Sequence, residues 1–92
     1  MIRTWANSAT RQFAETGKNK FSGMDQEAAE ERLAALDAAT SLDDLSPLKS
    51  VGLHKLTGSR KGRWAMTING PWRICFRFAD GDAWDVDIVD YH

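Results

Sequence analysis

The sequence lacks the residues and spacings that would cross-link the chain or build a metal site. Its single cysteine, Cys75, excludes an internal disulfide, and its position in the apolar run WRICFRF predicts a small buried or half-buried side chain. No CxxC, HxH or HExxH spacing occurs, and the two histidines and the cysteine are scattered along the chain. The sequence therefore gives no support to a redox centre or a zinc site.

Long hydrophobic runs are also absent. No apolar stretch approaches the roughly 20 residues that span a bilayer, and the opening MIRTWANSAT lacks the apolar segment of a signal peptide. The glycines show neither the Rossmann nor the P-loop spacing, so no nucleotide cofactor is expected. With 92 residues there is room for one compact core. We expect a single domain over residues 1–92, located in the cytoplasm, with no membrane contact and no cofactor.

Acidic residues are missing from one long segment. There is no Asp or Glu between Leu45 and Ala79, although the formal net charge of the whole chain is -1. The basic residues of this segment are Lys49, Lys55, Arg60, Lys61, Arg63, Arg73 and Arg77. Such a segment creates a local positive potential that suits a polyanion such as RNA. A basic face that only meets solvent would have the same composition, so the charge pattern alone leaves both interpretations open.

The first half of the chain shows helical patterns. After a short strand at residues 2–5, Asn7 or Ser8 can cap a helix that ends at Gly17. Residues 25–39 combine strong helix formers with one apolar stripe, which predicts a second helix. The stripe favours a helix that faces the core, and a helix that faces a partner remains an alternative.

Beyond a short capped turn at residues 41–44, apolar and polar residues alternate. Four alternating runs, at 52–56, 63–69, 72–78 and 83–89, are separated by turn residues. Four tryptophans and four phenylalanines supply enough aromatic surface to close a small core between sheet and helices. The pattern predicts an α+β domain in which an N-terminal strand and two to three helices accompany a twisted antiparallel sheet.

Alternation divides the side chains of these runs between two faces of the sheet. The face that we expect the helices to cover carries Trp64, Met66, Ile68, Trp72, Ile74, Phe76, Phe78, Trp84, Val86 and Ile88. The opposite face carries Arg63, Thr67, Asn69, Arg73, Cys75, Arg77, Asp85, Asp87 and Val89. Basic side chains should therefore gather on the uncovered face.

Several residues have the chemistry that RNA cleavage without a metal requires. That reaction needs a base for the 2′-OH proton, a cation for the charge on the phosphorane, and an acid for the leaving 5′-oxygen. His54 or His92 can act as base or acid near pH 7, Arg73 can hold the phosphate through its planar fork, and Tyr91 can donate or position a proton. The sequence thus contains a candidate for each role.

Each candidate also has a simpler interpretation. Arg73 can form an ion pair with Asp85 or Asp87 on the next strand, and residues 90–92 can be an ordinary chain end. The aspartates of residues 80–90 could hold Mg²⁺, but they lie along one turn and one strand, which favours a solvated edge. A metal-dependent nuclease is therefore the weakest of the functions considered.

Two longer motifs are more specific than any single residue. The first is Leu53-x-x-Leu56-x-Gly58-x-Arg60-x-Gly62-x-Trp64, and the second runs from Trp72-Arg73-Ile74-x-Phe76-x-Phe78 through Gly81 to Asp90-Tyr91-His92. With these motifs, nearly the whole chain resembles the HigB-type branch of the RelE-like toxins of type II toxin-antitoxin systems. The resemblance implies the microbial-ribonuclease fold.

The resemblance further implies a toxin that inhibits translation as a metal-independent endoribonuclease, cutting mRNA in the ribosomal A site. Its implied partners are mRNA, the ribosome and a HigA-like helix-turn-helix antitoxin. The toxin would contact operator DNA only through this antitoxin. The positions that match catalytic residues are His54, Arg60, Arg73, Asp90, Tyr91 and His92. The positions expected to contact RNA or the ribosome are Lys55, Lys61, Arg63 and Arg77.

One position departs from the family pattern. Some relatives have a lysine between the second leucine of the first motif and its glycine, where this chain has Thr57. Strand alternation puts Lys55 on the same side as Thr57, so Lys55 is the candidate to replace that lysine. The main alternative to a nuclease is a non-catalytic module that holds RNA or a protein on the basic face.

Overall fold

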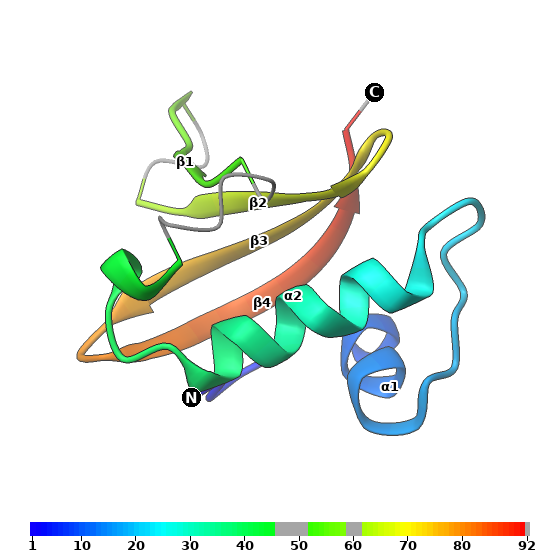
Figure 1. The fold of residues 1–92 in the computed structure, drawn as a ribbon, viewed down its shortest axis with the longest axis horizontal. Helices are drawn as coiled ribbons and strands as arrows, with labels where there is room; N and C mark the ends of the chain where they lie inside the picture. Colours follow the sequence, from blue (N-terminus) through cyan, green and yellow to red (C-terminus); the bar gives the residue numbers. More distant parts are fainter. Residues whose placement is uncertain (46–51, 59–61, 92) are drawn as a thin grey trace.

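The computed structural model describes residues 1–45, 52–58 and 62–91, and these form two layers. Helices α1 (Ser8–Thr16) and α2 (Gln26–Ala38) pack on one face of a sheet, and the short 3-10 helix η1 (Leu42–Asp44) follows α2 (Figure 1). The strands of the sheet are antiparallel, in the spatial order β1 (His54–Lys55), β2 (Trp64–Asn69), β3 (Trp72–Ala79) and β4 (Asp82–Asp90). The predicted α+β class is confirmed.

Polar side chains begin both helices where the sequence predicts them. The Asn7 carboxamide oxygen accepts a hydrogen bond from the amide of Thr10 at 2.9 Å, and Gly17 ends α1 in the left-handed conformation. The Asp25 carboxylate does the same for the amide of Ala28 at 3.1 Å. Neither helix of the described chain is long and apolar enough to cross a membrane.

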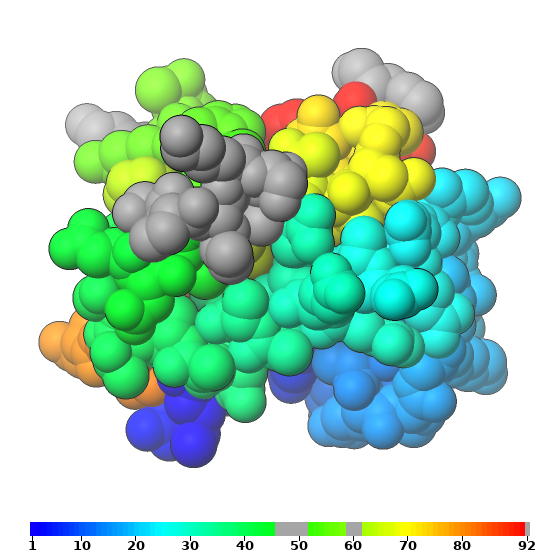
Figure 2. Space-filling view, viewed as in Figure 1, coloured from blue at the N-terminus to red at the C-terminus, as the bar shows by residue number. Residues whose placement is uncertain are grey.

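One apolar core lies between the helices and the sheet. Phe13 of α1 and Leu36 of α2 meet Ile74, Phe76 and the neighbouring strand residues, all of them buried. In Figure 2 the atoms of both helices cover the lower part of this side of the molecule. Apart from one tryptophan described below, the large apolar residues predicted to face the helices belong to this core or pack against it.

The N-terminal segment lies along the outer edge of β4 and runs parallel to it. Ile2 and Trp5 form bridges to Ala83 and Val86, and the amide of Val86 donates to the carbonyl of Thr4 at 3.1 Å. The predicted N-terminal strand is thus present as two isolated bridges. These bonds occupy the edge of β4 that would otherwise remain unpaired.

A bulge in β4 contradicts the predicted position of Trp84. The pairing shifts by one residue between Cys75 and Arg77, and Asp85 adopts a left-handed φ of 54° at the shift. Trp84 consequently pairs with Arg77 and lies on the face opposite to Val86. The prediction that Trp84 faces the helices was wrong, because it assumed unbroken alternation along the strand.

A second bulge, in β2, contradicts the predicted position of Asn69. The pairing shifts between Thr67 and Asn69, which brings Asn69 opposite Trp72 on the helix side. The Asn69 side chain accepts a hydrogen bond from the amide of Asp25 at 2.8 Å and donates to the carbonyl of Gly23 at 3.0 Å. Asn69 therefore ties the start of α2 to the sheet instead of lining the uncovered face.

We expect an acid-sensitive contribution to stability from Asp82. Its carboxylate lies 3.1 Å from the Arg3 guanidinium and 3.2 Å from the N-terminal amine. The hydrogen bond from Arg3 is the main reason that the pKa of Asp82 is below its usual value. Because the folded pKa is depressed, the stabilisation is present above the unfolded pKa of about 3.9 and is lost as the pH falls through the folded pKa.

The variant Asp82→Asn tests this expectation by urea unfolding at a series of pH values. It should unfold at lower urea than wild type at pH 7, and the difference should shrink as the pH falls below about 4. A difference that stays constant down to pH 2 would mean that the loss arises from packing and not from the charge.

Candidate functional site

The face of the sheet that the helices leave uncovered is called the open face. Its position follows from β3, whose even-numbered residues pack into the helix-side core while odd-numbered residues point the other way. Through the strand pairing it carries His54, Leu56, Arg63, Ala65, Thr67, Arg73, Cys75, Arg77, Trp84, Asp87 and Val89. As predicted, basic side chains gather on this face.

A small apolar cluster fills the middle of the open face. Leu56, Ala65 and Cys75 are buried there and Val89 packs against them. Cys75 is completely buried, as its place in the apolar run predicts. The polar side chains of the open face are therefore arranged around a buried apolar cluster.

His54 lies on the edge strand of the open face with a defined ring orientation. It pairs with Ala65, and its Nδ1 is 2.9 Å from the carbonyl oxygen of Gly52. Because a carbonyl can only accept, this contact assigns the proton to Nδ1 in the neutral ring. The other nitrogen, Nε2, then has a free lone pair, which is the state required of a general base.

Arg73 is held at the end of the open face nearest the turn between β2 and β3. Its Nη1 donates to the carbonyl of Gly70 at 2.6 Å and to the carbonyl of Trp72 at 2.9 Å. Its Nε and Nη2 groups have no hydrogen-bond partner within residues 1–45, 52–58 and 62–91. Nε and Nη2 form the side edge of the guanidinium, and this edge can bind a phosphate through two parallel hydrogen bonds.

The alternative ion pair of Arg73 with β4 is not what the structure contains. Asp85 instead binds Arg77 at 3.0 Å, and Asp87 accepts a hydrogen bond from the Asn7 carboxamide at 2.7 Å. Both aspartates thus have other partners, and no carboxylate of residues 1–45, 52–58 and 62–91 forms a salt bridge with Arg73.

Tyr91 follows β4 directly and continues its pairing with the β2–β3 turn. Its amide donates to the carbonyl of Pro71 at 2.7 Å, and the residue as a whole is 37% exposed. Strand alternation from Val89, which pairs with Arg73, directs Tyr91 to the open face beside Arg73. Asp90 pairs with Trp72, so the same alternation directs it to the helix side.

The described candidates thus divide into residues that lie on the open face and residues, Lys55 and Asp90, that alternation directs to the helix side. His54, Arg73 and Tyr91 share the open face, with His54 about two strand spacings, roughly 10 Å, from β3. Lys55 pairs with Trp64, whose ring packs against the helix-side core, so alternation directs Lys55 away from His54. The remaining predicted site residues, Arg60, Lys61 and His92, lie outside the described residues.

Arg63 and Arg77 form a second polar group on the open face, around Asp85. Arg77 donates through Nε to the Asp85 carboxylate at 3.0 Å, and Arg63 Nη2 lies 3.9 Å from the same carboxylate. The hydrogen bond from Arg77 is the main reason that the pKa of Asp85 is below its usual value. Asp85 therefore stays ionised, and the group as a whole keeps an excess positive charge.

The aspartates near the end of the chain do not converge on one point. Asp82 binds Arg3, Asp85 binds Arg77, and Asp87 binds Asn7. In the parts of the chain that the structure describes, no group of three or more His, Cys, Asp and Glu residues could hold a metal ion.

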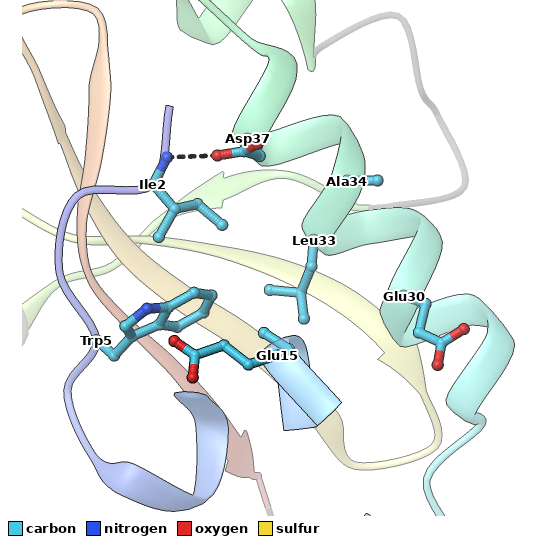
Figure 3. Close-up of a pocket in the computed structure, with 8 residues that line it drawn as sticks. Ile2, Trp5, Glu15, Glu30, Leu33, Ala34 and Asp37 are labelled. Carbon is cyan, nitrogen blue, oxygen red and sulfur yellow. Dashed lines mark hydrogen bonds between the residues drawn. The ribbon is translucent and has the colours of Figure 1, made fainter. Parts of the chain in front are cut away.

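A cavity of the described structure lies away from the open face. Its volume is about 320 Å³, and it lies between the N-terminal segment, α1 and α2 (Figure 3). Trp5 and Leu33 form an apolar wall, while Glu15, Glu30 and Asp37 supply carboxylates. A cavity with this charge repels RNA, so the open face is the candidate site for a polyanion.

Comparison with known proteins agrees with this geometry. Residues 3–92 match the family model described as the RelE-like toxin of the type II toxin-antitoxin system HigB. The chain belongs to the HigB-like toxin family. It is also 33% identical to the Endoribonuclease HigB of Proteus vulgaris, over the full length of both proteins. The resemblance inferred from the two sequence motifs is confirmed for this HigB-like toxin.

Trp84 is the residue of this face that the sequence did not reveal. Alternation assigned it to the core of the HigB-like toxin, and only the bulge at Asp85 reverses its direction. Asp is one of the few residue types that tolerate the left-handed conformation, which is a weak signal for such a bulge. Nothing else in the run AWDVDIV marks the change of register.

We expect the stability of the bulge to depend on the residue type at position 85. Asp85→Asn and Asp85→Ala both remove the charge that binds Arg77, but Asn tolerates a positive φ while Ala does not. Asp85→Ala should therefore be less stable than Asp85→Asn by about 1–2 kcal/mol, measured by urea unfolding. Equal stabilities would indicate that the left-handed conformation is not maintained in solution.

Proposed function

We propose that this HigB-like toxin is an endoribonuclease that cuts mRNA in the ribosomal A site and thereby inhibits translation. The observation that carries the proposal is the grouping of His54, Arg73 and Tyr91 on one face of the sheet, opposite the acidic cavity. The name of the Proteus vulgaris relative, an endoribonuclease, supports the same reaction class.

In the proposed reaction the ribose 2′-OH attacks the adjacent phosphorus. His54 Nε2 takes the 2′-OH proton, because Nδ1 already donates to the Gly52 carbonyl. The O2′–P bond forms and the P–O5′ bond breaks, leaving a 2′,3′-cyclic phosphate and a 5′-OH end. This chemistry requires no metal, since a cationic side chain can stabilise the phosphorane.

Arg73 is the proposed clamp for the scissile phosphate. Its Nη1 is anchored on two backbone carbonyls, so the side edge formed by Nε and Nη2 is pre-oriented. Tyr91 or His92 protonates the leaving 5′-oxygen, and Arg60 and Asp90 complete the proposed catalytic set. Lys55 and Lys61 are proposed to contact RNA or ribosomal RNA, as are Arg63 and Arg77, which lie further along the open face.

The proposed partners follow from the toxin-antitoxin family. They are mRNA, the ribosome and a HigA-like helix-turn-helix antitoxin, and operator DNA would be reached only through the antitoxin. The proposed location is the cytoplasm, where mRNA is translated.

We expect Arg73→Ala to abolish toxicity while the protein remains folded. The guanidinium makes hydrogen bonds only to carbonyls of the adjacent turn among the described residues, so its loss should cost little stability. The measurement is growth after induced expression, combined with mapping of mRNA 5′ ends. Wild type should arrest growth and cut within codons in frame, and the variant should do neither.

Arg11→Ala is the matched control, because Arg11 is an exposed arginine on α1, on the opposite side of the sheet. It should arrest growth as wild type does. If Arg73→Ala, shown to be folded, also arrests growth with the same cuts, the proposed mechanism is wrong. RNA binding by wild type without any cuts would favour the non-catalytic binding module.

Removal of Tyr91 and His92 should also suppress cleavage, because the proposed acid is one of these two residues. Tyr91→Phe separates them: it keeps the ring and the backbone bond to Pro71 but removes the hydroxyl. If the truncated protein cuts mRNA at the wild-type level, the interpretation of residues 90–92 as an ordinary chain end is correct. Cuts by Tyr91→Phe at that level would assign the acid to His92.

A further inference from the structure

Trp84 has an unusual environment for a tryptophan of this protein. Among the described residues, Trp5, Trp64 and Trp72 all pack against the helix-side core. Trp84 belongs neither to that core nor to the apolar cluster of the open face, and its side chain is partly exposed. Packing against either of these two apolar clusters therefore does not explain why a large aromatic residue stands at this position.

The backbone is distorted to put the indole ring there. Ala83 pairs with Phe78 and is buried on the helix side, Trp84 pairs with Arg77 on the open face, and Asp85 then takes a φ of 54°. A left-handed non-glycine residue costs free energy, and such residues are concentrated at functional sites, as are bulges that redirect a side chain.

The indole is held in one orientation by its own polar group. Its Nε1 donates to the carbonyl of Ala79 at 3.2 Å, which satisfies the single donor of the side chain. A ring fixed in this way loses little conformational freedom when a flat ligand stacks on it.

The charges around Trp84 favour an anionic partner. Arg63 and Arg77 have side chains that are 31% and 45% exposed, and both contact the carboxylate of Asp85. Two guanidinium groups around one carboxylate leave an excess positive charge. Arg77 binds Asp85 through Nε, which leaves its terminal amino groups outside that ion pair and available to a phosphate.

We propose that Trp84 is a stacking platform for a nucleobase of the bound RNA, with Arg63 and Arg77 contacting the phosphates on either side of that base. The proposal rests on the proposed function in one respect, that RNA lies along the open face. Aromatic rings between cationic side chains on an uncovered sheet are a common arrangement for single-stranded RNA.

The position of the platform identifies which base it would hold. Arg77 is four residues from Arg73 along β3, a separation of about 13 Å. A few nucleotides of single-stranded RNA cover that distance, so the stacked base belongs to a nucleotide that flanks the cleaved one. Stacking tolerates any base, and it would therefore contribute affinity and register more than sequence preference.

The test measures binding to ribosomes that carry an mRNA whose A-site codon and neighbours are 2′-O-methylated. The modified RNA has no attacking hydroxyl, so binding is separated from cleavage. Trp84→Leu should weaken binding about fivefold or more, because stacking on one aromatic side chain is worth about 1–3 kcal/mol and about 1.4 kcal/mol corresponds to a factor of ten. Trp84→Phe should bind within about threefold of wild type, because a phenyl ring still offers a face for stacking.

Two controls isolate the ring face from other effects. Phe and Leu both lack the indole N–H, so each variant loses the bond to Ala79 and only the ring distinguishes them. Trp64→Leu makes the same replacement at a ring that packs on the helix side, and it should bind as wild type at equal folded fraction. If Trp84→Leu does not fold, Trp84→Met takes its place.

An abasic scan of the mRNA identifies the stacked base directly. One abasic position should weaken wild-type binding about tenfold and leave binding by Trp84→Leu unchanged, because the ring that the base would contact is already absent. The proposal would be overturned if each abasic position reduced the affinity of wild type and Trp84→Leu equally. It would also be overturned if Trp84→Leu bound the unmodified bases with wild-type affinity.

The results that would contradict the proposed function differ from those that would contradict the role of Trp84. Wild type that binds the methylated mRNA but leaves no cuts in unmodified mRNA would contradict the nuclease, while the abasic scan would still decide the role of Trp84. Absence of binding by wild type to programmed ribosomes would overturn both proposals.

Discussion

The bulge at Asp85 is the constraint on which the arrangement of the open face depends. Its left-handed backbone shifts the pairing of β4 by one residue, so that Val86 and Trp84 point to opposite faces. The conformation is supported from two directions. The Asp85 amide donates to the Thr4 hydroxyl at 2.8 Å, and the carboxylate binds Arg77 across the sheet. The N-terminal segment forms bridges to β4 on both sides of the bulge, at Ala83 and Val86.

The bulge also organises the charges of the open face. Asp85 collects Arg63 and Arg77 at one end, which leaves Arg73 at the other end with its side edge unoccupied by the described residues. The arginines of the open face thus lie away from the carboxylates of Glu15, Glu30 and Asp37, which line the cavity between the N-terminal segment, α1 and α2. A field of this shape orients an approaching RNA toward the sheet.

The sequence predicted those parts of the fold that local rules determine. The capped start of α1 at Asn7, one of the two predicted candidates, the buried stripe of α2 and the faces of β3 all follow from side-chain chemistry and period. The positions of Trp84 and Asn69 could not be predicted, because a bulge changes the period by one residue and depends on partners distant in sequence. For Asp85 these partners include Thr4, and for Asn69 they are the backbone groups of residues 23 and 25.

The candidate site was predicted unevenly for the same reason. Residue types identified His54, Arg73 and Tyr91, and the structure brings them to one face. Alternation also suggested that Lys55 could replace the lysine absent at Thr57. The pairing of Lys55 with Trp64 directs it to the helix side, and two paired residues of β1 do not establish the direction of Thr57.

The two central site residues differ in how firmly the fold holds them. Arg73 belongs to β3, which pairs along its length with β2 and β4, and its guanidinium is anchored on two carbonyls. His54 belongs to a strand of two residues that, among the strands of the described residues, pairs with β2 alone. Edge segments with few ladder bonds open at lower free energy than central strands. The proposed phosphate clamp is therefore held more firmly than the proposed base, and we expect His54 to adjust its position more readily than Arg73 if RNA binds as proposed.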